Sequence, residues 1–288
     1  MASKKSVLIT GASTGFGALT AEAFAADGWR VFASMRNVAG ANAGAATRFR
    51  SAGIDVVELD VTSDASVDAA AKIVADEVGA LDVVVNNAGI AWFGIQEAFT
   101  PQRVEQLYAT NVFGPLRVNR AFLPAMRERK SGLIIFISSV VGRIVFPFGG
   151  IYDSSKWALE ALAQTAAYEL APFDVDVAVV EPGAFPTEIL GKSGGADDEA
   201  RARSYGDELA AHGAAALDRI VQRAQGNDPK DVATLVLRLA NTPFGARPFR
   251  SVVPANPAVE AINAATEPIQ RQVIASVGIP ALLPKTPA

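Results

Sequence analysis

The 288-residue sequence has no cysteine and one histidine, His212. Without cysteine there is no disulfide, no thiolate nucleophile and no cysteine-ligated zinc site. A single histidine also excludes a metal site of the H-E-x-x-H type, which needs two. His212 lies in an Ala- and Gly-rich stretch and is interpreted as a surface residue. The sequence therefore predicts chemistry without a metal.

Long runs of one kind of residue are also missing. The net charge is −4 and basic runs do not exceed two or three residues, so no nucleic-acid partner is predicted. No segment reaches the roughly 18 consecutive apolar residues of a membrane-spanning helix. The opening stretch "MASKKSVLIT" lacks the long apolar core of a signal peptide. These features predict a cytoplasmic protein with no membrane partner.

Half of the residues are apolar and 19% are charged, which is enough to build a large core. Short β-branched runs alternate with longer Ala-rich helical patterns. These runs are nearly continuous in apolar residues, which is typical of strands buried on both faces of a parallel sheet. The sequence predicts an α/β fold: a doubly wound, mainly parallel Rossmann sheet flanked by helices on both faces. The expected strands are "SVLITG", "RVFASM", "IDVVELD", "LDVVVNNAG", "GLIIFISS", "VDVAVVEPG" and "PFRSVV".

The helical patterns indicate one domain over residues 1–288. A polar, Gly-rich change of pattern at about 184–226 predicts a lid over the site, and the Pro-rich residues 278–288 predict an extended tail. One long helix is expected at about 100–129, interrupted or bent by Pro115 and Pro124. The other expected helices cover about 15–27, 63–79, a segment that includes Tyr152, 229–240 and 256–276.

The first expected strand runs into "TGASTGFG", residues 10–17, where a helix should begin. Glycines allow a tight turn and let the backbone approach a pyrophosphate, which then meets the free N–H groups of the helix. The G-x-x-x-G-x-G spacing differs from the usual G-x-G-x-x-G, but its position between strand and helix favours a dinucleotide site. A merely structural turn remains the alternative.

The end of the second strand should select the nicotinamide cofactor. A carboxylate there would hold the ribose 2′-hydroxyl of NAD. The strand ends at Met35, and Arg36 follows. A guanidinium at this place suits the 2′-phosphate, so NADP(H) is predicted over NAD(H). The alternative is that Arg36 is a surface cation.

Tyr152 and Lys156 lie four residues apart in "IYDSSKWALEAL" and share one face if this segment is helical. A nearby ammonium would favour the phenolate and so lower the tyrosine pKa. Alone, a tyrosine and a lysine at this spacing say little about function.

Six motifs in order give the pair a context: "TGASTGFG", "NNAG" at 86–89, Asn111, "SS" at 138–139, "YDSSK" at 152–156 and "PG" at 182–183. In this combination the sequence resembles the short-chain dehydrogenase/reductase family over about residues 5–187. The resemblance implies a reaction that moves a hydride between nicotinamide and a carbonyl or secondary alcohol. It also implies a homodimer or homotetramer, with a small-molecule substrate as the ligand.

The resemblance implies a role for each matching residue. Tyr152 would be the general acid or base, and Ser139, thirteen positions earlier, would bind the substrate oxygen, while Ser138 supports packing. Lys156 would hold the nicotinamide ribose, and Asn111 would anchor a water that links Lys156 to solvent. The expected cofactor-binding residues are Gly11, Ser13, Thr14, Gly15, Phe16, Gly17, Arg36, Asp60, Val61, Asn87, Ala88, Gly89, Tyr152, Lys156, Pro182, Gly183 and Thr187.

Apolar and aromatic residues cluster on both sides of these motifs and predict a hydrophobic substrate. They are Trp92, Phe93, Val141, Ile144, Phe146, Phe148 and Phe185. An equally weighted alternative is that several of them pack the lid or a subunit interface. The alternative functions are an NAD-preferring dehydrogenase and a catalytically silent cofactor sensor. An epimerase or dehydratase typically has a larger C-terminal substrate domain than the short lid expected here, and a methyltransferase leaves the Tyr-Lys pair unexplained.

Overall fold

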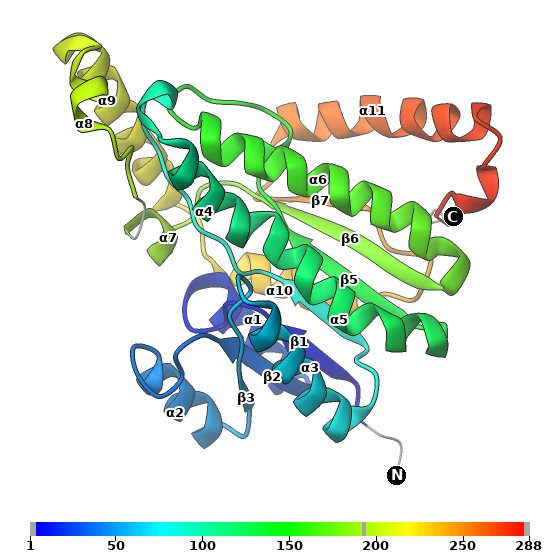
Figure 1. Cartoon of the computed structure of the whole chain (residues 1–288). Coiled ribbons are helices and arrows are strands. Elements are labelled where there is room, and N and C mark those ends of the chain that lie inside the picture. The colour runs from blue at the N-terminus through cyan, green and yellow to red at the C-terminus, as the bar shows by residue number, and fades with distance from the viewer. Residues whose placement is uncertain (1–3, 192–193, 285–288) are drawn as a thin grey trace.

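The computed structural model describes residues 4–191 and 194–284. Its centre is a seven-stranded sheet with the order β3-β2-β1-β4-β5-β6-β7, and all neighbouring strands are parallel (Figure 1). This confirms the predicted fold class. The strands are β1 Ser6–Ile9, β2 Arg30–Met35, β3 Asp55–Glu58, β4 Val83–Asn86, β5 Gly132–Ile137, β6 Val175–Pro182 and β7 Arg250–Val253.

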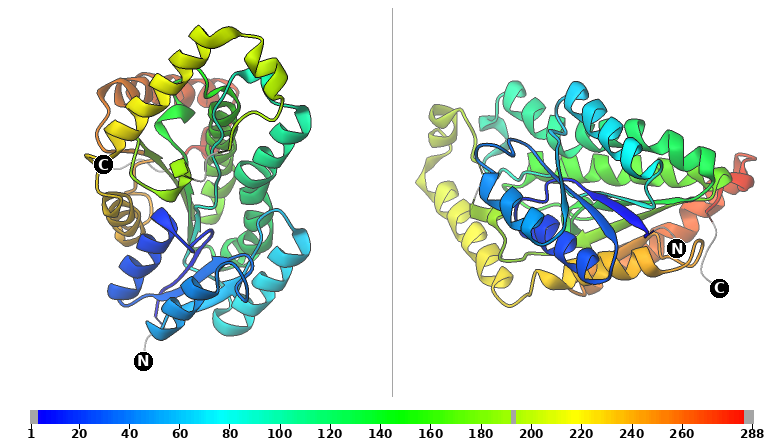
Figure 2. Two further views of the ribbon diagram at one scale, coloured as in Figure 1. Left: turned by 90° about the vertical axis from the view of Figure 1, so that its left-hand side faces the viewer. Right: turned by 90° about the horizontal axis from the view of Figure 1, so that it is seen from below.

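Helices cover both faces of the sheet, as Figure 2 shows. Helices α1 (Gly15–Ala26), α2 (Ala43–Ser51) and α10 (Lys230–Asn241) pack into one core cluster, and α3 (Asp64–Val78), α5 (Phe113–Arg129) and α6 (Gly150–Leu170) into the other. Strand β5 shows why its sequence is continuously apolar. Ile135 and Ile137 enter the first cluster, whereas Ile134 and Phe136 enter the second.

The chain reverses its direction of winding at β1. It moves outward from β1 to β3 at one edge, then crosses back to β4 on the other side of β1. The carboxyl ends of β1 and β4 therefore lie at a topological switch point, where open α/β sheets bind their ligands. The turns after these two strands carry the "TGASTGFG" and "NNAG" sequences.

The single long helix expected at 100–129 is two helices, α4 (Pro101–Asn111) and α5. The break falls at Val112, with φ −116°, rather than at a proline. Pro115 lies in the first turn of α5, where its missing N–H costs no intrahelical bond. Pro124 lies inside α5, which continues to Arg129.

The expected tail is wrong for residues 278–284. After α11 (Pro257–Ser276), residues Pro280–Leu282 form the short helix η4, and the Arg271 side chain donates to the carbonyl of Pro284 over 3.2 Å. This hydrogen bond folds the segment back along α11 instead of leaving it extended. Residues 285–288 lie outside the described part of the chain.

The predicted lid region contains α7 (Glu188–Gly191), α8 (Glu199–Arg203) and α9 (Gly206–Ala224). In Figure 1 α8 and α9 stand at one end of the molecule, beside the start of α4. In the two described ranges no helix has the length and apolar content to cross a membrane.

Candidate active site

The turn after β1 is built around two glycines with left-handed backbone. Gly11 has φ +64° and Gly15 has φ +57°, a region that other residues rarely adopt. A Cβ on Gly11 would lie 2.8 Å from the Cα of Ala88, and one on Gly17 would lie 2.5 Å from the amide nitrogen of Asn87. The glycines therefore let the turn after β1 pack directly on the turn after β4.

Thr10 joins these two turns and was not singled out from the sequence. Its hydroxyl oxygen accepts hydrogen bonds from the backbone N–H groups of Asn87 (2.9 Å) and Ala88 (3.0 Å). The Asn87 amide in turn donates to the carbonyls of Thr10 (2.7 Å) and Gly11 (3.2 Å). Asn87 thus stabilises the glycine turn through hydrogen bonds. This structural role is separate from its predicted contact with the cofactor.

The start of α1, which follows the glycine turn, has features that fit a dinucleotide pyrophosphate. Helix α1 begins after Thr14, whose side chain caps none of the N–H groups among the described residues, and its first turn has no acidic side chain. The N–H groups at this positive helix end are therefore left for an anion. Thr187 lies over Gly15, since a Cβ there would be 3.7 Å from the Thr187 Cβ. Ser13 and Phe16 lie in the same turn and helix start, half-buried.

The expected adenine end lies beyond β2 and β3. Arg36 is exposed directly after β2, and its carbonyl accepts from the Asn42 side chain over 2.6 Å. Burial acts to raise the pKa of the Asp60 carboxyl, but hydrogen bonds from Thr62 and the charge of Arg36 bring that pKa below its usual value. Val61 is buried against α5, where a Cβ on Gly114 would lie 2.9 Å from it.

Asn111 explains the break between α4 and α5. Its side-chain oxygen accepts from the N–H of Ile90 and its amide donates to the carbonyl of Ile90, both over 2.9 Å. The amide also donates to the Ser155 hydroxyl over 3.1 Å. Asn111, the last residue of α4, therefore bonds the chain just past Gly89 to the end of α4 and to α6. In the sequence alone, nothing distinguishes it from any other polar residue of a helix.

Ser139 lies at the carboxyl end of β5 and is buried. Its hydroxyl donates to the carbonyl of Pro182, at the end of β6, over 3.3 Å, and accepts from the N–H of Val141 over 3.3 Å. Gly183 follows, with its N–H bonded to the carbonyl of Val253 over 2.8 Å. The β5 and β6 strand ends therefore fix the serine hydroxyl in place.

Tyr152 lies in the first turn of α6. Burial raises the pKa of its phenol above the usual value, a hydrogen bond with Ser139 opposes the shift, and the neighbouring carboxylate of Asp153 adds to it. The direction is opposite to the one expected from the sequence. The Lys156 ammonium lies 5.8 Å from the phenol ring centroid. The protein's own groups therefore hold Tyr152 as a neutral phenol at pH 7.

Lys156 projects from the same face of α6, one turn later. Its ammonium donates to the carbonyl of Ile137 over 2.9 Å, and a Cβ on Gly89 would lie 3.8 Å from it. Burial lowers the pKa of Lys156 to about 8, while the charge of Glu160 acts in the opposite direction. At pH 7 most Lys156 side chains therefore remain ammonium ions.

Asp153 is a second residue that the sequence did not single out. It is buried, its carboxylate accepts from the N–H of Phe146 over 2.8 Å, and a Cβ on Gly149 would lie 2.7 Å from it. Burial raises its pKa to about 6, against the effect of that hydrogen bond. Asp153 thereby fastens the loop that leads into Tyr152. Its only sequence signal is its place beside the tyrosine.

The aromatic residues predicted to line a pocket separate into two groups. The Phe93 ring meets the Tyr152 ring edge-on at 5.8 Å, and Phe148 has its ring beside Gly213 of α9. Val141 follows Ser139 in the short helix η2 (Val140–Gly142). These three lie next to the site or between it and the lid region, whereas the half-buried Ile144 follows η2.

The other three lie elsewhere. Trp92 is buried beneath the Arg103 guanidinium, 3.8 Å from its ring centroid, and Phe185 is buried against Phe16. Burial on all sides makes both of them packing residues, in line with the second interpretation of this set. Phe146 is 44% exposed and lines a surface hollow with Trp157.

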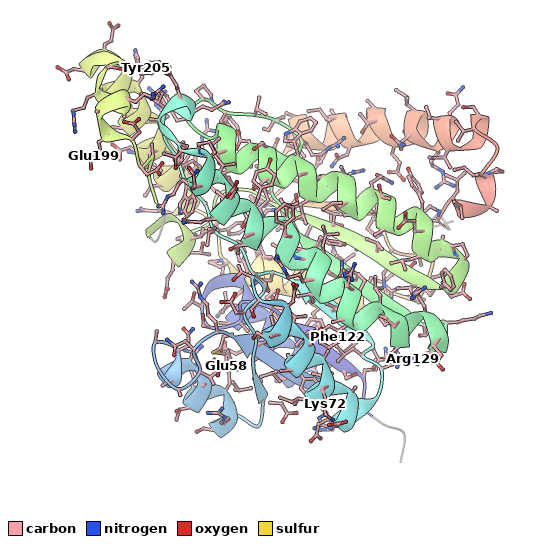
Figure 3. The ribbon with its side chains drawn as sticks, viewed as in Figure 1. Glu58, Lys72, Phe122, Arg129, Glu199 and Tyr205 are labelled. Atoms are coloured by element: carbon pink, nitrogen blue, oxygen red, sulfur yellow. The ribbon has the colours of Figure 1, made fainter. Side chains whose placement is uncertain are left out.

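The lid region is tied to the segment before α4. Arg201 donates to the carboxylate of Glu97 over 2.7 Å, and the Tyr205 hydroxyl donates to the other oxygen of that carboxylate. Thr100 donates to Asp197 through its N–H (2.9 Å) and its hydroxyl (2.6 Å). Figure 3 shows Tyr205 at the outer end of this region. Surface polar contacts therefore join this region to the segment before α4, and Ala196 also packs against the buried Trp92 and Phe99.

Metal ligands do not gather anywhere in the part of the chain that the structure describes: no group of three His, Cys, Asp or Glu residues could hold an ion there. His212 is exposed on α9. The site brings together a phenol, a hydroxyl and an ammonium near the N-terminus of α1.

Known proteins are similar to this chain in sequence. The family described as short chain dehydrogenase matches residues 5–197. A 3-ketodihydrosphingosine reductase of Bacteroides thetaiotaomicron is 37% identical over 181 residues, which cover 63% of this chain and 64% of the reductase, just under two thirds of its length. The 17-beta-hydroxysteroid dehydrogenase type 1 of Mus musculus is 36% identical over 82% of this chain and 70% of that enzyme.

Solved structures share the fold. A short-chain dehydrogenase from Streptomyces avermitilis has a TM-score of 0.77 at 32% identity, over 96% of both chains. A Burkholderia phymatum relative in complex with NAD has a TM-score of 0.73 at 29% identity, over 93% of this chain and 95% of that one. An actinorhodin polyketide ketoreductase with NADPH reaches 0.72 at 28% identity, over 88% and 97%. This chain belongs to the short-chain dehydrogenase family of oxidoreductases.

Proposed function

We propose that this protein is an NADP(H)-dependent oxidoreductase that interconverts a carbonyl and a secondary alcohol on a hydrophobic substrate. One observation carries the proposal: the phenol of Tyr152, the hydroxyl of Ser139 and the ammonium of Lys156 converge beside the glycine turn, and Gly89 links the two parts. Family relatives solved with NAD or NADPH support a nicotinamide cofactor.

The cofactor would be held by backbone groups more than by side chains. The pyrophosphate would lie at the N-terminus of α1, on the turn of Gly11, Gly15 and Gly17. Asn87, Ala88 and Gly89 would line the next part, and Thr187 would close over the turn from the far side. When bound, the nicotinamide supplies or accepts the hydride.

Acid–base chemistry falls to the chain itself. Tyr152 gives its phenolic proton to the substrate oxygen during reduction and takes it back during oxidation. Ser139 donates a hydrogen bond to the same oxygen as charge develops on it. Burial raises the pKa of Tyr152, so its phenol is neutral at pH 7. The neutral phenol is the acid that donates the proton during reduction.

Arg36 supports the preference for NADP(H). It is the exposed cation at the end of β2, where a carboxylate would hold the NAD ribose, and its neighbours Met35 and Asn37 carry no charge. Bidentate charge-assisted bonds from a guanidinium suit a phosphate monoester. The effect of Arg36 on Asp60 places this positive charge near the expected adenine end.

A hydrophobic substrate is supported by the aromatic rings around Tyr152 and by the relatives. Phe93 contacts the phenol ring, and Phe148 connects this region to α9. Two relatives are named for reactions of a ketodihydrosphingosine and of a hydroxysteroid. We propose that residues 184–226 act as a lid that closes the apolar space between these rings and the substrate.

The test is NADPH oxidation by the purified protein against a panel of hydrophobic ketones and aldehydes, with NADH assayed in parallel. Turnover of at least one carbonyl is expected, with higher kcat/KM for NADPH than for NADH. Higher kcat/KM for NADH would overturn the cofactor preference. Tight NADPH binding with no turnover of any carbonyl would favour a cofactor sensor instead.

A further inference from the structure

Helix α6 buries three ionisable side chains, Asp153, Lys156 and Glu160. Glu160 lies one helical turn after Lys156 and on the same face. Glu160 is 3% exposed and Lys156 is 6% exposed. Charged side chains are almost never buried to this degree unless they are paired. The burial of Glu160 therefore requires a partner of opposite charge.

Arg250 of β7 holds one oxygen of Glu160. The guanidinium Nε donates to Oε2 over 2.9 Å, and the same nitrogen lies 3.6 Å from Oε1 of Glu181, a fully buried carboxylate of β6. Glu181 also accepts from the Asn263 amide over 2.6 Å, and Asn263 accepts from Arg143 over 2.8 Å. Glu160 is thus fixed at the edge of a buried polar network.

The other oxygen of Glu160 points toward the strand end that carries Ser139. Oε1 has no hydrogen-bond partner among the described residues, and neither does the Ser138 hydroxyl. Both atoms lie around Gly142, where a Cβ would be 2.8 Å from the Ser138 hydroxyl and 3.3 Å from Oε1. Lys156 donates to the carbonyl of Ile137, directly before Ser138. Lys156 and Glu160 therefore both lie beside the end of β5, near Ile137 and Ser138.

The charges around the pair separate into two sides. Lys156 faces Tyr152 on its own helix, the uncharged Asn111 and Gly89, and the carbonyl of Ile137. Glu160 faces the cations of β7 and of the loop after η2, which are Arg250 and Arg143, and the carboxylate Glu181. Glu160 is the group whose charge acts to raise the pKa of Lys156, against the effect of burial.

We propose that Glu160 is a positioning residue for Lys156, whose buried negative charge, fixed by Arg250, keeps the lysine an ammonium ion bonded to the carbonyl of Ile137. The proposal rests on the function proposed above for Tyr152 and Lys156. Neutral lysine would lose one donor and the positive charge beside the phenol. Glu160 would thus set the upper pH limit of activity without touching substrate or cofactor.

The pair is tested by titrating Lys156 directly. In protein labelled with ¹³C at the lysine ε-carbons, the Lys156 signal is assigned by its absence in Lys156→Arg. Glu160→Gln keeps the shape and removes the charge, and it is expected to lower the pKa of Lys156 by about one pH unit. Glu169→Gln, the same change at an exposed position of α6, is expected to leave it unchanged.

Should Glu160→Gln fail to fold, Glu160→Asp moves the charge one methylene away and is expected to give a smaller shift in the same direction. An unchanged Lys156 titration in the folded variants contradicts the proposal. In turnover assays the alkaline limb of the kcat/KM profile should move to lower pH in Glu160→Gln and not in Glu169→Gln.

The two measurements separate this inference from the proposed function. The titration needs no substrate, so it tests the Glu160–Lys156 pair even if no carbonyl is turned over. Turnover of a carbonyl together with an unmoved Lys156 titration would leave the function standing and remove the role of Glu160.

Discussion

At the scale of single residues, the exposed Arg36 side chain carries the proposed preference for NADP(H) over NAD(H). It follows β2 where the 2′ position of the adenosine ribose is expected. Arg36→Ala removes a charge-assisted contact of about 1.5 to 3 kcal/mol, so kcat/KM for NADPH should fall by about ten- to a hundredfold. The value for NADH should hardly change.

The matched control for this prediction is Arg50→Ala, which removes another exposed arginine, on α2. It should leave the ratio of NADPH to NADH kcat/KM as in the unaltered protein. Steady-state kinetics with both cofactors on all three proteins give the ratio. Equal losses for NADPH and NADH in Arg36→Ala would contradict the assigned role of Arg36.

The sequence predicted the site residues that belong to linear motifs better than those whose role depends on contacts between distant parts of the chain. Spacing paired Tyr152 with Lys156, the family resemblance added Ser139, and the structure brings the three together. Thr10 and Asp153 were not predicted, because their roles depend on hydrogen-bond partners outside any local motif. The partners of Thr10, for example, lie 77 and 78 positions away in the sequence. The direction of the Tyr152 pKa was also missed, because burial depends on packing that no local pattern records.

At the scale of elements, an ion pair at the surface helps to join the region containing α8 and α9 to the segment before α4. Arg201 joins α8 to Glu97 in the segment before α4, whereas Arg203 bonds Glu199 inside α8. If the region is a lid, Arg201→Ala should loosen its closed position and raise KM for a hydrophobic carbonyl several-fold, because closure helps hold the substrate.

Arg203→Ala is the control, since it removes an exposed arginine of the same helix and leaves the bond between Arg201 and Glu97 intact. It should leave KM unchanged, and thermal unfolding should show nearly the same Tm for both variants because exposed ion pairs contribute little. An unchanged KM in Arg201→Ala would argue that these contacts do not govern closure.

Element boundaries show what local sequence patterns omit. Continuous apolar runs predicted the strands well, and the helix expected over about 63–79 is α3, which Ser63 caps by accepting from the N–H of Ser66. The break at Val112 was placed at prolines instead, because the cause is the side chain of Asn111 bonding to Ile90. A helix end determined by a tertiary contact has no signal of its own in the sequence.

At the scale of the whole molecule, the polar network around Glu181 links α6, β6, β7 and α11 inside the core. Burial raises the pKa of Glu181 to about 7, and Glu160 adds to the shift. A carboxyl whose folded pKa lies above its unfolded value stabilises the fold fully below the unfolded pKa, about 4.3. That contribution is lost as the pH rises through about 7.

Glu181→Gln removes this dependence on pH while keeping an oxygen that can accept from Asn263. Relative to the variant, the unaltered protein should lose about 2 to 3 kcal/mol in free energy of unfolding between pH 5 and pH 8. Urea unfolding at both pH values measures the difference, with Glu169→Gln as the exposed control. A difference that does not change with pH would show that Glu181 stays ionised throughout.

Long-range order was the part of the fold least accessible from sequence. The class of a doubly wound parallel sheet followed from apolar runs alternating with helices, but the order β3-β2-β1-β4-β5-β6-β7 is a property of pairings across the chain. The tail after Gly278 was expected to extend, yet Arg271 bonds it back to α11. Proline content predicts where a helix ends, not where the next segment packs.

The measurement that tests the central claim most directly compares Tyr152→Phe with Tyr168→Phe, two removals of a hydroxyl from α6. With a carbonyl that the unaltered protein reduces, Tyr152→Phe should lower kcat by about a hundredfold or more, because the general acid is gone. NADPH binding should stay within a few-fold of the unaltered protein, and Tyr168→Phe should keep normal turnover. Most of the turnover surviving in Tyr152→Phe would contradict the account.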